Sequence, residues 1–97
     1  MYILGVGLFD WNEKKNQLLK KERGIGFEDI VAAIDGGLLD VYDHPNQETY
    51  PNQKIYVIEA LGYVYLVPFV RDGNMIFLKT IIPSRKALRI YKGETDV

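Results

Sequence analysis

The sequence predicts an α+β fold with two N-terminal helices, a four-stranded antiparallel sheet and a C-terminal helix. Two changes of pattern support this prediction. Apolar residues recur at helical spacing up to residue 37, then with a period of two from residue 38 to about residue 82. A short basic segment follows Pro83 and Ser84. Because 97 residues provide one hydrophobic core, we expect residues 1–97 to form a single domain.

Two signals predict the N-terminal helices. Asp10 followed by Glu13 is a capping-box pattern, and the helix it starts would end at Gly24. The second helix would end at Gly36-Gly37. Its apolar residues have the spacing i, i+3, i+4, i+7: Phe27, Ile30, Val31 and Ile34. A short strand before Phe9 is a further possibility.

Four segments rich in Tyr, Ile and Val predict the strands. They are Leu38–His44, Lys54–Leu61, Tyr63–Val70 and Met75–Ile82. Tight turns are expected at Leu61-Gly62 and Asp72-Gly73. Pro68 lacks an N–H group, which favours an edge strand or a bulge. Ser84 is expected to cap a last helix over Arg85–Lys92.

The two faces of this sheet are both apolar. A two-residue turn at Leu61-Gly62 places Tyr56, Tyr63, Tyr65 and Phe69 on one face with Lys54. The other face carries Ile55, Val57, Val64 and Leu66. Three short helices are not expected to cover both faces, so the tyrosine face should contact a partner. The sequence therefore predicts a homodimer or a hetero-oligomer.

Composition excludes several classes of protein. With 47% hydrophobic and 26% charged residues, the chain is neither disordered nor collagen-like. No apolar run reaches the roughly 18 residues of a membrane-spanning helix. The absence of cysteine excludes disulfides, thiolate nucleophiles and cysteine-based zinc sites. We expect a cytoplasmic protein without a membrane partner, a metal or another cofactor.

Charge is segregated although the net charge is only −1. Residues 25–53 contain six acids and no Lys or Arg, whereas residues 74–93 contain five bases and no acid. The acids are Glu28, Asp29, Asp35, Asp40, Asp43 and Glu48, and the bases are Lys79, Arg85, Lys86, Arg89 and Lys92. Local patches, more than the average charge, should therefore determine what the surface attracts.

A series of short motifs resembles the BrnT family of toxins from bacterial type II toxin–antitoxin pairs. In chain order they are Phe9-Asp10-Trp11-Asn12, Lys14-Lys15-Asn16, Gly24-Ile25, Phe27-Glu28, Gly62, Ile82-Pro83-Ser84-Arg85-Lys86-Ala87 and Tyr91. The resemblance implies a RelE-like fold and a small ribonuclease that cleaves messenger RNA. It also implies a co-expressed antitoxin, often of the ribbon-helix-helix type. Arg23 stands where the family has a histidine, and Lys54 is the candidate for a basic residue expected near the start of the long middle strand.

Cleavage of RNA without a metal requires help with deprotonating the 2′-hydroxyl, stabilising the phosphorane and protonating the leaving oxygen. One histidine excludes a two-histidine mechanism, and RelE-like proteins use Lys, Arg and Tyr instead. The candidate catalytic residues are Lys54, Lys79 and Arg85, and the candidate RNA-binding residues are Lys21, Arg23, Lys86, Arg89 and Tyr91. Lys54 could instead be a solvated strand end, Lys79 a partner of Glu59, and Arg85 part of a solvated basic helix.

Two further interpretations compete with the ribonuclease. A non-catalytic, toxin-like subunit that dimerises and binds a ribbon-helix-helix partner agrees with the sequence pI near 5.8, because proteins that contact phosphates are usually basic. A plain RNA-binding sheet would show the aromatic motif of an RRM, which the sequence lacks.

His44 could be an acid or base, although a role in stabilising its turn is the stronger expectation.

Overall fold

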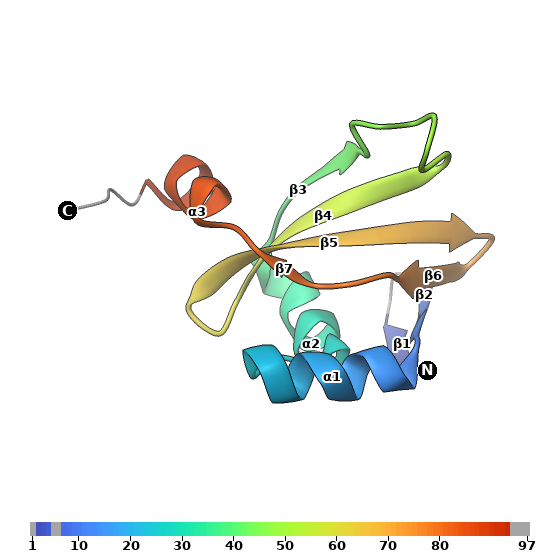
Figure 1. Cartoon of the computed structure of the whole chain (residues 1–97), viewed down its shortest axis with the longest axis horizontal. Coiled ribbons are helices and arrows are strands. Elements are labelled where there is room, and N and C mark those ends of the chain that lie inside the picture. Colours follow the sequence, from blue (N-terminus) through green and yellow to red (C-terminus); the bar gives the residue numbers. More distant parts are fainter. Residues whose placement is uncertain (1, 5–6, 94–97) are drawn as a thin grey trace.

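The computed structural model describes residues 2–4 and 7–93, and these form an α+β fold of three helices and one sheet (Figure 1). The elements are β1 (Tyr2–Leu4), β2 (Gly7–Trp11), α1 (Glu13–Arg23), α2 (Phe27–Gly37), β3 (Leu38–Asp43), β4 (Gln53–Ala60), β5 (Tyr63–Asp72), β6 (Met75–Leu78), β7 (Ile82–Pro83) and α3 (Arg85–Lys92). The predicted fold class and the three helices are confirmed. Within the described ranges no helix has the length and apolar character needed to cross a membrane.

The sheet is mixed, so the prediction of four antiparallel strands is wrong. Its strand order is β1-β2-β6-β5-β4-β3, with β7 paired to β5. β2 runs parallel to β6, in a register that pairs Leu8 with Met75 and Trp11 with Leu78, and the other pairs are antiparallel. The difference arises because the segment before α1 is part of the core: Phe9 is fully buried in β2.

Helix α1 begins later than the capping-box pattern suggests. Trp11 still belongs to β2, so Asn12 is the N-cap and its side-chain oxygen accepts a hydrogen bond of 2.9 Å from the backbone N–H of Lys15. The predicted end of α1 is confirmed, since Gly24 is the left-handed C-cap with φ of 68°. The predicted cap of α3 is also confirmed, because the Ser84 side chain accepts a hydrogen bond from the N–H of Ala87.

The hairpin of β4 and β5 forms the centre of the sheet. Leu61 and Gly62 make its two-residue turn with φ of 52° and 77°, as the type I′ geometry of such hairpins requires. The register continues without interruption from Ala60 opposite Tyr63 to Lys54 opposite Phe69. The alternation of side chains predicted for β4 and β5 is therefore confirmed.

Pro68 determines where β6 ends. It lies inside this regular register, opposite Ile55, so the bulge predicted for it is wrong. Its carbonyl accepts a hydrogen bond of 2.8 Å from the N–H of Lys79, but proline has no N–H to donate in return. The ladder with β6 consequently stops at Leu78, and the strand predicted to reach Ile82 is divided into β6 and β7.

Helices α1 and α2 cover the face of the sheet that carries the tyrosines, and we call it the helix face. Tyr56 and Tyr65 are only 8% and 9% exposed. They belong to a core cluster whose helical members include Leu19, Phe27 and Ile30. The prediction that this face needs a partner to cover it is therefore wrong. Figure 1 shows α1 and α2 on the same side of the sheet, and their apolar residues share one core with these tyrosines.

The opposite face of the sheet, the α3 face, has a smaller core. Val57 and Val64 pack there against Ala87 of α3. Polar contacts also join α3 to the sheet: the Tyr91 hydroxyl donates to Asp40 Oδ2 at 2.7 Å, and Lys92 Nζ lies 3.0 Å from Glu59 Oε1. The sequence also allowed an ion pair between Lys79 and Glu59, but Glu59 pairs with Lys92.

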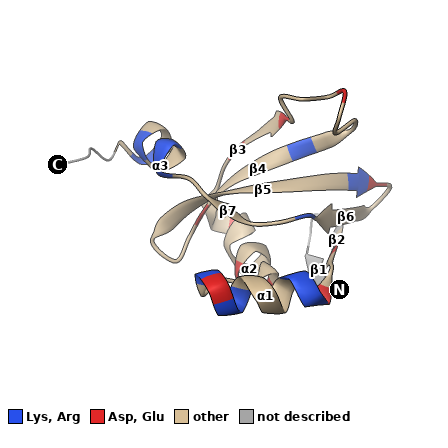
Figure 2. Ribbon diagram, viewed as in Figure 1, with Lys and Arg blue, Asp and Glu red and all other residues tan. Residues whose placement is uncertain are grey.

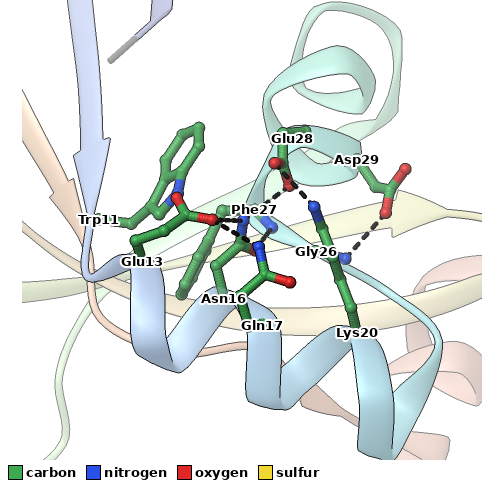
Figure 3. A network of polar contacts seen from close by, with 9 residues as sticks. All are labelled: Trp11, Glu13, Asn16, Gln17, Lys20, Gly26, Phe27, Glu28 and Asp29. Carbon is green, nitrogen blue, oxygen red and sulfur yellow. Dashed lines mark hydrogen bonds and ion pairs between the residues drawn. The ribbon is translucent and has the colours of Figure 1, made fainter.

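A polar network joins α1 to α2 at their buried junction (Figure 3). Asn16 is completely buried. Its Oδ1 accepts a hydrogen bond of 2.7 Å from the N–H of Phe27, and its Nδ2 donates to Glu28 at 2.9 Å. Lys20 completes the group through an ion pair of 2.9 Å with Glu28. Asn16 thus caps α2 from the neighbouring helix, because the N-cap Gly26 has no side chain to do so.

Candidate functional site

A basic cleft opens where β4 begins and β5 ends. It consists of two adjoining pockets that share Asn52, Lys54 and Arg71. The aromatic pocket has a volume of about 340 Å³ and is completed by Val41, Tyr56 and Phe69. The polar pocket has a volume of about 460 Å³ and is completed by Asp43, Gln47 and Gln53. Both volumes are near the lower end of the range for small-molecule sites, so each pocket suits a group the size of one nucleotide.

Strand register brings the two cations of this cleft together. Lys54 is opposite Phe69, and Arg71 follows Phe69 by two residues, so their side chains project from the same face of neighbouring strands. Figure 2 shows a basic segment on β4 and another toward the end of β5. These two strands are neighbours in the sheet. The rings of Tyr56 and Phe69 stack at 3.9 Å between centroids, and both residues line the aromatic pocket.

The two cations differ in their surroundings. Lys54 Nζ lies 2.8 Å from Asp43 Oδ1 on the adjacent strand β3, and both side chains are more than half exposed. Arg71 is exposed and makes no hydrogen bond or ion pair to any residue that the structure describes. Its guanidinium fork is thus available for a bidentate contact with a phosphate.

Tyr56 is the tyrosine that lines the aromatic pocket. Burial raises the pKa of Tyr56 above the ordinary tyrosine value, and the nearby charge of Arg71 opposes this rise only partly. The phenol, like any tyrosine, is protonated at neutral pH and can donate a hydrogen bond or a proton. Two cations, a phenol and an amide in one cleft can bind an anion and protonate an oxygen next to it.

Of the candidate catalytic residues, the structure places Lys54 in the cleft but not Lys79 or Arg85. Lys79 lies on the α3 face, where its Nζ is 5.6 Å from the centre of the Phe77 ring. Arg85 begins α3, which packs on that same face. The sheet therefore separates Lys54 from the other two residues.

The candidate RNA-binding residues also lie outside the cleft. Lys21 and Arg23 are at the end of α1, where the Arg23 guanidinium donates to the Ile81 carbonyl. Lys86 and Arg89 are on α3, as is Tyr91. The hydrogen bond between the Tyr91 hydroxyl and the Asp40 carboxylate raises the pKa of Tyr91 and lowers the pKa of Asp40.

Sequence reasoning missed Arg71, Tyr56 as a site residue, and the polar side chains of the second pocket. The signal for Arg71 was available, because a turn at Leu61-Gly62 fixes the register that brings it beside Lys54. Asp43 could not be found this way. Its position relative to Lys54 depends on a register shift between Leu38 and Asp40 in β3, and the sequence gives no sign of that shift.

His44 occupies a turn next to the cleft without lining either pocket. Its Nδ1 accepts a hydrogen bond of 3.0 Å from the N–H of Asn46, and its ring contacts that of Tyr50. This arrangement agrees with the turn-stabilising role expected for it. Among the described residues, no group of three or more His, Cys, Asp or Glu side chains could hold a metal ion.

Comparison with known proteins identifies no relative of this chain: no family model, no curated protein and no solved structure matches it.

Proposed function

We propose that this protein is an endoribonuclease of the BrnT toxin type that cleaves messenger RNA without a metal, by attack of a 2′-hydroxyl on the adjacent phosphate. The observation that carries the proposal is that Arg71 and Lys54 line one pocket together with the stacked rings of Tyr56 and Phe69. The motifs that resemble the BrnT family support the same activity. They also favour a cytoplasmic protein that a ribbon-helix-helix antitoxin holds inactive.

The residues of the cleft suit three parts of this reaction. Arg71 would stabilise the charge that develops on the phosphorane, since its fork matches two phosphate oxygens. Lys54 would hold the phosphate as a point charge. Tyr56 lines the same pocket and carries a phenol that is protonated at neutral pH, so it would give a proton to the departing 5′-oxygen.

An assay with a defined RNA tests this proposal. The purified chain, in the presence of EDTA, should cleave a labelled RNA and leave a 2′,3′-cyclic phosphate, and a 2′-deoxy substitution at the cleaved position should block the reaction. Arg71→Ala should lower the rate by about 10²- to 10³-fold, the usual loss when one stabilising donor is removed. Circular dichroism should show an unchanged fold, because Arg71 is exposed.

Lys79→Ala and Arg85→Ala are the matched controls, because each removes one cation from the opposite face of the sheet. Both variants should cleave like the parent. If Arg85→Ala is inactive while Arg71→Ala is active, the site lies on the α3 face and the cleft has another role.

The alternative is a non-catalytic, toxin-like subunit that dimerises and binds a ribbon-helix-helix partner. One observation favours it: Asp43 already neutralises Lys54, and the net charge of the chain is −1. Absence of cleavage by the parent chain, together with stable binding to an antitoxin encoded beside it, would establish this alternative.

A further inference from the structure

The basic cleft contains a carboxylate that the proposed function does not yet use. Asp43 is the only acidic residue among those that line the aromatic and polar pockets. Its Oδ1 lies 2.8 Å from Lys54 Nζ, and its side chain is 71% exposed, so an RNA that enters the cleft can reach it. The neighbouring acid of β3, Asp40, is hydrogen-bonded to Tyr91 on the opposite face.

Cleavage by a 2′-hydroxyl needs a group that accepts its proton. The other polar side chains of the cleft are poor acceptors of a proton. Lys54 is engaged as a cation by Asp43, and the guanidinium of Arg71 does not deprotonate. Tyr56 is a neutral phenol at neutral pH, and the remaining polar groups are amides. The carboxylate of Asp43 is the one group left.

We propose, on the basis of the proposed function, that Asp43 is the general base of the ribonuclease. The Asp43 carboxylate takes the proton of the 2′-hydroxyl while the 2′-oxygen forms a bond to phosphorus. The bond from phosphorus to the 5′-oxygen breaks, and that oxygen takes the proton of the Tyr56 hydroxyl. The products are a 2′,3′-cyclic phosphate and a 5′-hydroxyl end, and exchange with water restores both side chains.

The ion pair with Lys54 positions Asp43 for this step. An ammonium group has three N–H donors, so Lys54 can hold the carboxylate and a phosphate oxygen together. The Asp43 carboxylate and the reacting phosphate then lie next to each other, because both contact the Lys54 ammonium. The pair is exposed and therefore weak, so the cleft can adjust to an incoming RNA without a large loss of stability.

A general base at this position predicts opposite effects on binding and on chemistry. The Asp43 carboxylate lies beside the cations that hold the phosphate, so its negative charge repels the RNA backbone. Asp43→Asn should therefore bind RNA more tightly, by about 5-fold for one charge at contact distance in a solvated site. The same variant should cleave about 10²- to 10⁴-fold more slowly, because an amide does not accept the proton.

The experiment measures the dissociation constant for an uncleavable 2′-deoxy-substituted oligonucleotide and the single-turnover rate with the matching RNA. Asp40→Asn is the control, since it removes the same charge from the same strand on the opposite face, and it should cleave like the parent. Asp43→Glu keeps a carboxylate and should retain more activity than Asp43→Asn.

Other results would overturn the inference. Tighter binding with undiminished cleavage by Asp43→Asn would show that Asp43 only repels RNA. Weaker binding and slower cleavage together would show that it only holds Lys54 in place. A parent chain that does not cleave RNA at all would contradict the proposed function itself, so the two failures are distinguishable.

Discussion

The buried amide of Asn16 links two helices through a single side chain. It satisfies the N–H of Phe27 and donates to Glu28, whose other oxygen pairs with Lys20. If this buried amide had no hydrogen-bond partners, the folded state would be less stable by about 1–3 kcal/mol. The network therefore joins α1 to the start of α2, and these helices in turn cover the face of the sheet on which the cleft opens.

The pKa of Glu28 predicts how stability depends on pH. Burial alone would raise this pKa, but the hydrogen bonds from Asn16 and Lys20 outweigh burial and lower the pKa below its ordinary value of 4.5. A carboxylate with a lowered pKa stabilises the folded state fully above the ordinary value, and this contribution is lost as the pH falls through the lowered pKa.

Urea unfolding at pH values from 7 to 3 measures this effect. Glu28→Gln should lower the free energy of unfolding at pH 7 and reduce the loss of stability between pH 4.5 and pH 3. Glu48→Gln is the control, because Glu48 is exposed and makes no hydrogen bond or ion pair to a described residue. An unchanged pH slope in Glu28→Gln would contradict the assignment.

At the level of elements, the end of α2 shows how closely a helix approaches the sheet. A Cβ atom added to Gly37 would lie 2.3 Å from the carbonyl oxygen of Glu59 in β4, whereas a Cβ at Gly36 would meet nothing within 4 Å. Two adjacent glycines in one helix therefore have different roles. Gly37 permits the close approach of two backbones, and Gly36 only lowers the helix propensity.

These two glycines predict opposite changes in stability. Gly36→Ala should stabilise the protein by about 0.5–1 kcal/mol, because alanine is the better helix former. Gly37→Ala should destabilise it by about 1–3 kcal/mol, because α2 must move away from β4. Thermal unfolding of both variants measures the difference, and equal effects would show that α2 does not approach β4 this closely.

The elements differ in how far local sequence determines them. The helices and the β4–β5 hairpin could be predicted because caps, periodicity and the Leu61-Gly62 turn act over a few residues. The pairing of β2 with β6 could not, because each strand gains its partner from a distant part of the chain. The cleft falls between these cases: its Lys54–Arg71 pair follows from the hairpin register, but Asp43 depends on the irregular register of β3.

For the whole molecule, this mixture of local and distant pairing predicts an order of folding. The β4–β5 hairpin should form early, and β2 should join the sheet late, because closing the long loop costs conformational entropy. Phe69→Leu in β5 and Phe9→Leu in β2 are a matched pair of buried substitutions, each expected to cost about 1–2 kcal/mol.

Stopped-flow refolding distinguishes the two strands. Phe69→Leu should mainly slow folding, whereas Phe9→Leu should mainly accelerate unfolding, since its contacts form after the transition state. Slower folding of Phe9→Leu with an unchanged unfolding rate would place the parallel pair in the folding nucleus.

The parallel pair also has a consequence for translation. The ribosome synthesises β2 (residues 7–11) before β6 (residues 75–78), so at about 5–20 residues per second the two strands leave it roughly 3–13 s apart. During that interval one edge of β2 has unpaired backbone groups that another nascent chain could bind. A pause in synthesis after β2 has left the ribosome and before β6 has left it should therefore increase aggregation during synthesis.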